Sequence, residues 1–263
     1  MELNASLPKY FRRALNLALA VVFVVAVAAP DFSPQLLPIL IALAATASIA
    51  ALHRQLPLQN VLLAAAITAL IGGAAHGLSA NPNLSIPFGP LVFNPDTGAK
   101  IFSSVPWPVP LLWIVALFSA RGVARLILRP WRKIKNYGWW LIGVTAVLAV
   151  AFDLALEPFA TQVQHLWRWQ PTKIAATWSG ASPLNFLGWI FIALLILAFA
   201  TPSLIKKQPG SPGAPDFHPL FVWLGALLLF ALGAAGAGLW WPVAVDAAIA
   251  AVTVVLAVRG ARW

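Results

Sequence analysis

The stretch LNFLGWIFIALLILAFATP, which runs from Leu184 to Pro202, decides the fold class. It contains no charged residue, and it is close to the roughly 20 apolar residues that an α-helix needs to cross a lipid bilayer. In water such a stretch would leave a large apolar surface exposed. We therefore predict a transmembrane helix here.

Further apolar stretches of the same kind occur on both sides of it, although several are short or contain glycine. They are Ala14–Ala29, Pro34–Leu52, Leu58–Leu78, Val105–Leu128, Tyr137–Leu156, Pro219–Gly238 and Pro242–Val258. Together they predict an all-α protein, a polytopic transmembrane helix bundle of about eight spans. Six spans is an alternative, because losing one hairpin keeps both termini on one side. The segment Gly236–Trp241 is either a tight turn or part of one long helix.

The composition agrees with a membrane protein. Of the 263 residues, 61% are hydrophobic and 9% are charged, whereas soluble domains carry about 25% charged residues. The chain has no cysteine, which excludes disulfides and cysteine metal sites. The net charge of +10 does not indicate nucleic-acid binding, because the basic residues flank the apolar spans.

The distribution of charge predicts the orientation. With the N-terminus in the cytoplasm, all but three of the 17 Lys and Arg residues fall on the cytoplasmic side, the exceptions being Lys100, Arg168 and Lys173. Basic residues favour the cytoplasmic side of membrane proteins. We therefore expect both termini inside, although the first stretch, with Ala26–Ala28 before Pro30, also fits a cleaved signal peptide.

The connecting segments predict a division of the chain. We expect a transmembrane core over residues 1–205, with two long outer loops at 79–104 and 157–183 that are rich in aromatic residues. Residues 206–217, rich in Pro and Gly, predict a mobile cytoplasmic linker. Residues 218–263 then form a C-terminal transmembrane hairpin.

Two acidic residues are the first candidates for chemistry. Asp153 and Glu157 lie four residues apart near the outer end of a span, so they share one helical face. Two carboxylates this close repel each other when both are ionised, which favours one of them holding a proton at neutral pH. A protonated carboxylic acid in an apolar site is a general acid. The structural alternative is that Asp153 bonds a neighbouring helix and Glu157 sits at the membrane interface.

Aromatic residues form a second group on the same outer side. Trp167, Trp169 and Trp178 lie in the second outer loop, Trp189 starts one span and Trp107 and Trp113 start another. Their rings can stabilise a carbocation, but tryptophan also anchors spans at membrane interfaces. His76 ends a span on the outer side and fits a hydrogen-bonded interface residue. No metal-ligand spacing and no phosphate-binding glycine motif occurs, so we expect no cofactor and no metal.

Several short motifs follow one another along the chain. They are PFG at Pro87–Gly89, VP at Val105–Pro106, FDL at Phe152–Leu154, LEP at Leu156–Pro158, WRW at Trp167–Trp169 and PLNFLGW at Pro183–Trp189. In this order they resemble the membrane carotenoid biosynthesis family that includes the carotenoid 1,2-hydratases of the bisanhydrobacterioruberin and γ-carotene type. The resemblance covers Ile71–Phe199. Two segments depart from the family pattern: Ala74–Gly77, where the family has an acidic residue, and Ser179–Pro183, where it has Tyr-Gly-x-Pro.

The resemblance implies that water is added to the terminal C1,C2 double bond of an acyclic carotenoid. Asp153 would deliver the proton, Glu157 would hold its proton or orient water, and Asn185 would position water or the acid. Trp169 and Trp189 would face the cation, with Trp167, Trp113 and His76 completing the substrate site. The implied partners are the lipid bilayer, a carotenoid substrate and other carotenoid enzymes, in the inner membrane of a bacterium and without nucleic acid.

Three alternatives remain open from the sequence. The chain is a carotenoid- or lipid-binding subunit without catalysis, an isoprenoid cyclase or isomerase that uses the same protonation, or a small transporter. A transporter is disfavoured because the sequence shows no internal repeat and its acidic residues gather on one side.

Overall fold

The computed structural model of the protein describes residues 9–28, 33–101, 104–174, 176–205 and 214–263. Its main elements are α1 (Lys9–Ala28), α2 (Ser33–His53), α3 (Leu58–Ala80), β1 (Leu91–Phe93), β2 (Lys100–Ile101), β3 (Val105–Pro106), α4 (Pro108–Ile127), α5 (Tyr137–Pro158), β4 (Trp167–Trp169), α6 (Pro183–Ala200), α7 (His218–Gly236) and α8 (Trp240–Ala261). Short helical turns follow α4, α5 and α6 at Arg129–Trp131, Phe159–Val163 and Thr201–Leu204. The predicted all-α bundle is confirmed. Most of the predicted linker, and Pro30 beside the predicted cleavage site, lie outside the described residues.

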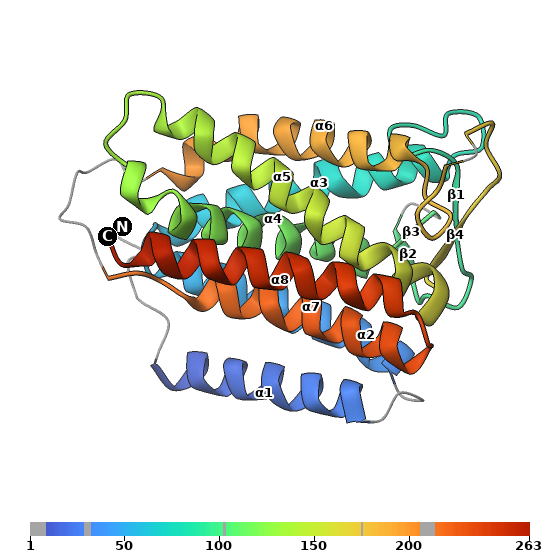
Figure 1. The fold of residues 1–263 in the computed structure, drawn as a ribbon, viewed down its shortest axis with the longest axis horizontal. Coiled ribbons are helices and arrows are strands. Elements are labelled where there is room, and N and C mark those ends of the chain that lie inside the picture. The colour runs from blue at the N-terminus through green and yellow to red at the C-terminus, as the bar shows by residue number, and fades with distance from the viewer. Residues whose placement is uncertain (1–8, 29–32, 102–103, 175, 206–213) are drawn as a thin grey trace.

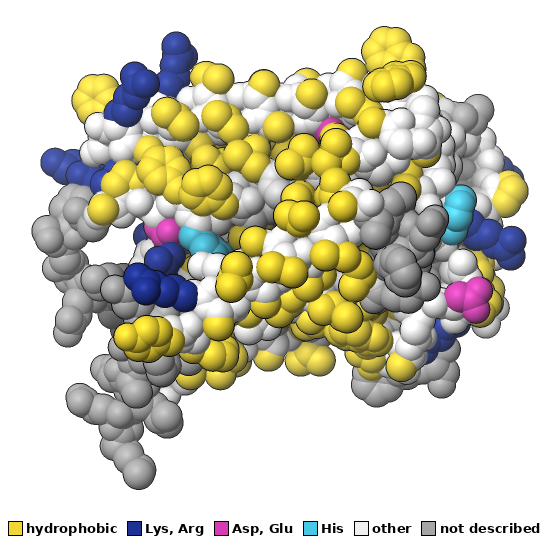
Figure 2. Space-filling view, turned by 90° about the horizontal axis from the view of Figure 1, so that it is seen from below, with side chains coloured by type: hydrophobic (Ala, Val, Ile, Leu, Met, Phe, Trp, Pro, Cys, Tyr) yellow, Lys and Arg dark blue, Asp and Glu magenta, His cyan; other side chains and the backbone are white. Residues whose placement is uncertain are grey.

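Seven helices, α2 to α8, are long and apolar enough to cross a membrane, and α1 has a shorter apolar part, Arg13–Ala28. The chain is thus an integral, multi-pass membrane protein. The first turn of α1 and the last turn of α8 lie at the same end of the bundle (Figure 1). Figure 2 shows Lys and Arg side chains concentrated at one end, with a broad apolar surface beside them. The inside orientation of this end stays a prediction.

Exposed tryptophans mark both ends of the bundle. Trp139 and Trp140 lie at the start of α5, and Trp240 and Trp241 lie at the start of α8. All four are exposed, and the two helices begin at opposite ends (Figure 1). Amphipathic indole rings favour the two membrane–water interfaces, so these pairs fit the two interfacial belts.

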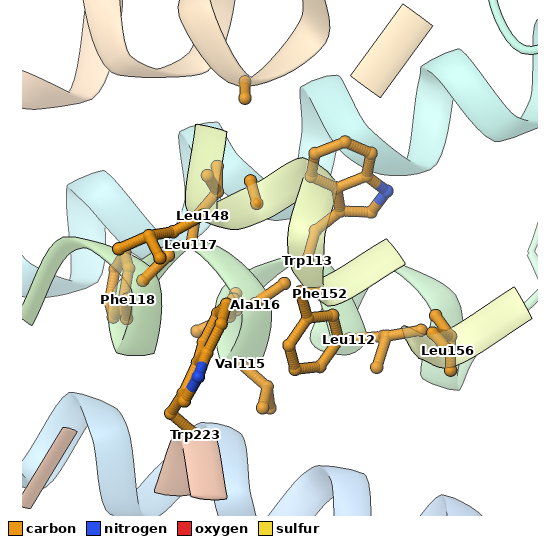
Figure 3. Packing of buried hydrophobic residues seen from close by; sticks show 14 of the residues in the cluster. Leu112, Trp113, Val115, Ala116, Leu117, Phe118, Leu148, Phe152, Leu156 and Trp223 are labelled. Atoms are coloured by element: carbon orange, nitrogen blue, oxygen red, sulfur yellow. The ribbon is translucent and has the colours of Figure 1, made fainter. Parts of the chain in front are cut away.

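Helix α4 forms the centre of the bundle and contacts α2, α3, α5, α7 and α8. Of its span 72% is buried within the protein, against 17% for α8, whose outer surface is left for lipid. Figure 3 shows Trp223 reaching from α7 towards Val115 and Ala116 of α4. The Phe152 ring lies 5.7 Å from that of Trp223, which joins α5 to the same core.

The segment between the last two helices is a tight turn, so the alternative of one long helix is wrong. Helix α7 ends at Gly236, and Gly238 adopts a positive φ of 73°, which glycine tolerates without strain. The backbone N–H of Leu239 returns to the carbonyl of Ala234 at 2.8 Å. The resulting hairpin packs on α4, while its separation from the core as a domain stays a prediction.

The two long loops on the far side are joined by backbone pairing. Strand β1 pairs antiparallel with β4 so that Leu91 lies opposite Trp169 and Phe93 opposite Trp167. Alternate residues of a strand point to the same face. The WRW triplet therefore directs both tryptophans to one side, and Arg168 is exposed.

Candidate functional site

Asp153 and Glu157 lie one turn apart on α5 and are both buried, each only 1% exposed. The chain does not leave the helix at Glu157, because the helix continues past Pro158 into a π-helical turn that reaches Val163; the depth of Glu157 in the membrane stays a prediction. Proline has no backbone N–H to donate to the carbonyl of Leu154. The indole N–H of Trp178 takes that place at 2.8 Å. This hydrogen bond lets the chain carry Glu157 in regular helix.

Asp153 is held by helix α6. The side-chain amide of Asn185 donates a hydrogen bond of 2.5 Å to Asp153 Oδ2. Asn185 is itself buried in the first turn of α6, which Pro183 starts. Asp153 Oδ1 is buried and has no hydrogen-bond partner among the described residues. One oxygen of this carboxyl group is thus fixed, and the other has no partner among the residues that the structure describes.

Glu157 is held by strand β4. The indole N–H of Trp169 donates to Glu157 Oε2 at 2.9 Å, and that of Trp167 donates to the same oxygen at 3.4 Å. Both donors reach one carboxylate because β4 presents alternate residues to one face. The pairing with β1 fixes that strand over the outer end of α5.

Beside the acidic pair lies a group of packed rings, which we call the aromatic cluster. It consists of His76, Phe88, Phe93, Trp113, Trp167 and Trp189. His76 occupies its centre, with the ring of Phe88 at 4.6 Å and those of the other four at 6.0 to 6.4 Å. Trp113 and Trp189 stack at 3.9 Å with an interplanar angle of 17°. Three helices, α3, α4 and α6, and the two long loops that carry β1 and β4 thus meet at this cluster.

The hydrogen bonds of His76 indicate which ring nitrogen carries its proton. His76 Nδ1 lies 3.1 Å from the indole nitrogen of Trp113 and 3.2 Å from the carbonyl of Gly72. An indole N–H can only donate, so Nδ1 accepts from Trp113 and the ring proton belongs on Nε2. A Cβ atom at Gly72 would lie 2.3 Å from Trp113 Cγ. Only glycine at this position lets the Trp113 ring lie against α3.

The structure brings all eight predicted site residues into one region. Trp167 connects the two parts, because it donates to Glu157 and its ring lies in the aromatic cluster. Helix α6 also connects the two parts: Asn185 donates to Asp153, and Trp189, one turn later, lies in the aromatic cluster. The sequence does not identify Phe88 and Phe93 as site residues, although Phe88 lies in the PFG motif at Pro87–Gly89. Trp178 was noted as a loop aromatic, without its bond to Leu154.

A cavity of about 400 Å³ runs along the other side of α5, between α1, α2, α4 and α7. Along α5 and the turn that follows it, the cavity is lined by Phe152, Leu156 and Phe159 and not by the two carboxylates. Positions 152, 156 and 159 share one helical face, and positions 153 and 157 lie on the neighbouring face. The two carboxylates are therefore directed away from the cavity lining, onto the neighbouring face of the helix.

No group of three or more His, Asp or Glu side chains in the described part of the chain has the arrangement of a metal site. The polar groups of the region are the two carboxyls, one amide, one imidazole and several indoles. This set can deliver and accept protons and can stabilise positive charge on a neighbouring apolar molecule.

Comparison with known proteins gives one match. A family model described as carotenoid biosynthesis protein matches residues 35–254, which extends beyond the motif region on both sides. No curated protein and no solved structure matches the chain. The matched range contains all eight site residues. Because the family model covers most of the sequence, the chain belongs to the carotenoid biosynthesis protein family.

Proposed function

We propose that this protein is an enzyme that adds water to the terminal C1,C2 double bond of an acyclic carotenoid by acid catalysis. Membership of the carotenoid biosynthesis family supports the pathway. The observation that carries the reaction type is the buried pair Asp153 and Glu157, one turn apart beside the aromatic cluster. Ionisable residues inside membrane spans are costly and usually serve a function.

In this proposal Asp153 is the acid. Its Oδ2 is held by Asn185, and its Oδ1 has no partner in the described part of the chain. A protonated Oδ1 would deliver its proton to C2 of the end group, and the electron pair of the double bond would form the new C–H bond. This step leaves a tertiary cation at C1. Proton transfer of this kind contributes about 10² to 10⁴ in rate.

Glu157 is the proposed base. Its Oε2 accepts hydrogen bonds from two indole N–H groups. An ionised carboxylate only accepts hydrogen bonds, so it is well suited to these two donors. It would orient a water molecule towards C1 and take up a proton as the C–O bond forms. Proton transfer between the two carboxyls then restores the starting state. The overall reaction consumes one water and needs no oxidant or reductant.

The rings supply stabilisation of the cation. Trp169 donates to Glu157 from β4, and Trp189 lies one turn after Asn185 on α6; we assign both rings to the cation. A cation over an indole face gains on the order of 2 kcal/mol when water is excluded. We assign Trp113, Trp167 and His76 to the wall of the same substrate site.

The setting of the reaction follows from the substrate. A carotenoid dissolves in the bilayer, so a membrane bundle meets it directly. We propose the inner membrane of a bacterium, with both termini in the cytoplasm, and other carotenoid enzymes as partners that supply the substrate. We keep the C-terminal hairpin, residues 218–263, as a unit joined by the linker 206–217.

The test is expression in a lycopene-producing bacterium followed by mass spectrometry of the extracted pigments. A product heavier than lycopene by one water supports the proposal. Unchanged lycopene, together with an unchanged monocyclic carotene, in cells that contain the folded protein would contradict it.

A non-catalytic carotenoid-binding subunit is the second candidate. It is favoured by the cavity, whose lining lacks Asp153 and Glu157, and by His76, which lies in the segment Ala74–Gly77, where the family resemblance implies an acidic residue. This candidate predicts that unmodified pigment purifies with the protein in fixed proportion.

A further inference from the structure

The cavity beside α5 continues into a second, polar cavity. The larger one, of about 400 Å³, is lined by apolar side chains except for Asn16 and His218. The second, of about 210 Å³, shares Asn16 and His218 and is lined also by Arg13 and Arg54. We call the two together the α1 groove. It is apolar along most of its length and cationic at one end.

The two arginines at the cationic end differ in whether they form an ion pair. Arg54 forms an ion pair of 2.9 Å with Asp216, which neutralises it locally. Arg13 has an exposed side chain and no ion-pair partner among the described residues. His218 Nδ1 is buried and also has no hydrogen-bond partner in the described part of the chain. Within the described part of the chain, the polar cavity is therefore lined by one arginine without an ion-pair partner and one ring nitrogen without a hydrogen-bond partner.

We propose that the α1 groove holds one anionic phospholipid, with its phosphate at Arg13 and His218 and its acyl chains in the apolar cavity. A phosphate oxygen complements both groups. A carotenoid hydrocarbon has no charged group that could form an ion pair with Arg13.

The length of the apolar part fits this ligand. The lining of α7 extends from His218 to Phe230, which is about 18 Å at 1.5 Å per residue. This is close to one leaflet and well short of the roughly 30 Å hydrocarbon core of a bilayer. The lipid would lie between α1 and the bundle, where α1 packs on α2 and α7.

Native mass spectrometry of the full-length protein in detergent tests the charge. The protein is titrated with phosphatidylglycerol and, separately, with phosphatidylcholine. We expect one phosphatidylglycerol per chain and a weaker bound population of phosphatidylcholine. Arg13→Gln should lower phosphatidylglycerol affinity about fivefold, the effect expected for one arginine near a lipid phosphate. The control is Arg262→Gln, because Arg262 is also exposed at the end of α8. Equal affinities of the two variants would overturn the proposal.

A second pair of variants tests the apolar part. Gly225 lines the cavity, and a Cβ atom there meets nothing within 4 Å. The same open space surrounds Gly143 on α5, which does not line the cavity. We expect Gly225→Phe to fill the groove and abolish the single bound lipid, while Gly143→Phe retains it. Retention in both variants, or a carotenoid mass in place of the lipid in the purified protein, would overturn the assignment.

Discussion

Asn185 and Asp153 lie 32 positions apart and form a 2.5 Å hydrogen bond between α6 and α5. The bond fixes one oxygen of a carboxyl group whose other oxygen has no partner among the described residues. A buried carboxyl oxygen without a partner is unfavourable, and in the proposed mechanism this oxygen carries the proton that is transferred.

Replacing Asp153 by Asn removes the transferable proton and keeps the shape of the side chain. We expect the hydrated product to fall by about a hundredfold or more, as for loss of a general acid, with normal protein levels. Asp246→Asn is the control, because Asp246 is also a buried acid, on α8, that is not assigned to the site. Full activity of the Asp153 variant in the lycopene assay would remove its assigned role.

Replacing Asn185 by Leu removes the amide N–H that donates a hydrogen bond to Asp153 Oδ2. A buried polar group that loses its partner costs about 1 to 3 kcal/mol, so thermal unfolding in detergent should shift to lower temperature. Activity should fall with it. Asn185→Gln, which keeps the amide on a longer side chain, should recover part of the stability. Unchanged unfolding temperatures in both variants would show that the bond contributes nothing.

Trp169→Phe and Trp167→Phe each keep an aromatic ring and remove one N–H donor to Glu157. The Trp169 bond is the shorter, at 2.9 Å against 3.4 Å. A hydrogen bond to a charged group contributes at least about 1.5 kcal/mol, which corresponds to about tenfold, so we expect Trp169→Phe to lower the hydration rate about tenfold and Trp167→Phe to lower it less. Product formation at equal protein levels measures both, and the reverse order of effects would count against Glu157 as the anchored base.

Gly72→Leu places a side chain where a Cβ atom already lies 2.3 Å from Trp113 Cγ. Either α3 or the stacked pair of Trp113 and Trp189 must move, at a cost of about 1 to 3 kcal/mol. A lower unfolding temperature and a loss of product are expected. Gly143→Leu, at an open position on α5, should change neither, and equal behaviour of the two variants would contradict the packing described.

The chain has no cysteine, so single cysteines report topology directly. We expect Lys133→Cys to be shielded from a membrane-impermeant maleimide in intact cells and Lys173→Cys to be labelled. Both lysines are exposed in the structure, so a difference in labelling would report the side of the membrane and not burial within the protein. Labelling of Lys133→Cys alone would reverse the predicted orientation.

The helices and the acidic pair were predictable because their signals are local. A run such as Leu184–Pro202 predicts a span by length and polarity alone, and the spacing of Asp153 and Glu157 places them on one face. The eight site residues followed from these patterns together with the family motifs. The structure places all of them in one region, while their chemical roles stay predictions.

The remaining features depend on contacts between distant parts of the chain. Pro158 ordinarily indicates a helix end, and it does not act as one here because Trp178, far along the sequence, bonds the free carbonyl of Leu154. Phe88 and Phe93 join the aromatic cluster only because the first outer loop folds back over α3. No periodicity in the sequence reports that path.

The pairing of β1 with β4 also orders the assembly of the protein during synthesis. The first of these strands leaves the ribosome before α4 and α5, and the second leaves after both. Until Trp167–Trp169 has been synthesised and has paired with β1, Glu157 lacks both indole donors. A nascent chain that stops short of β4 therefore has neither the indole donors of Glu157 nor the amide donor of Asp153, which follows in α6.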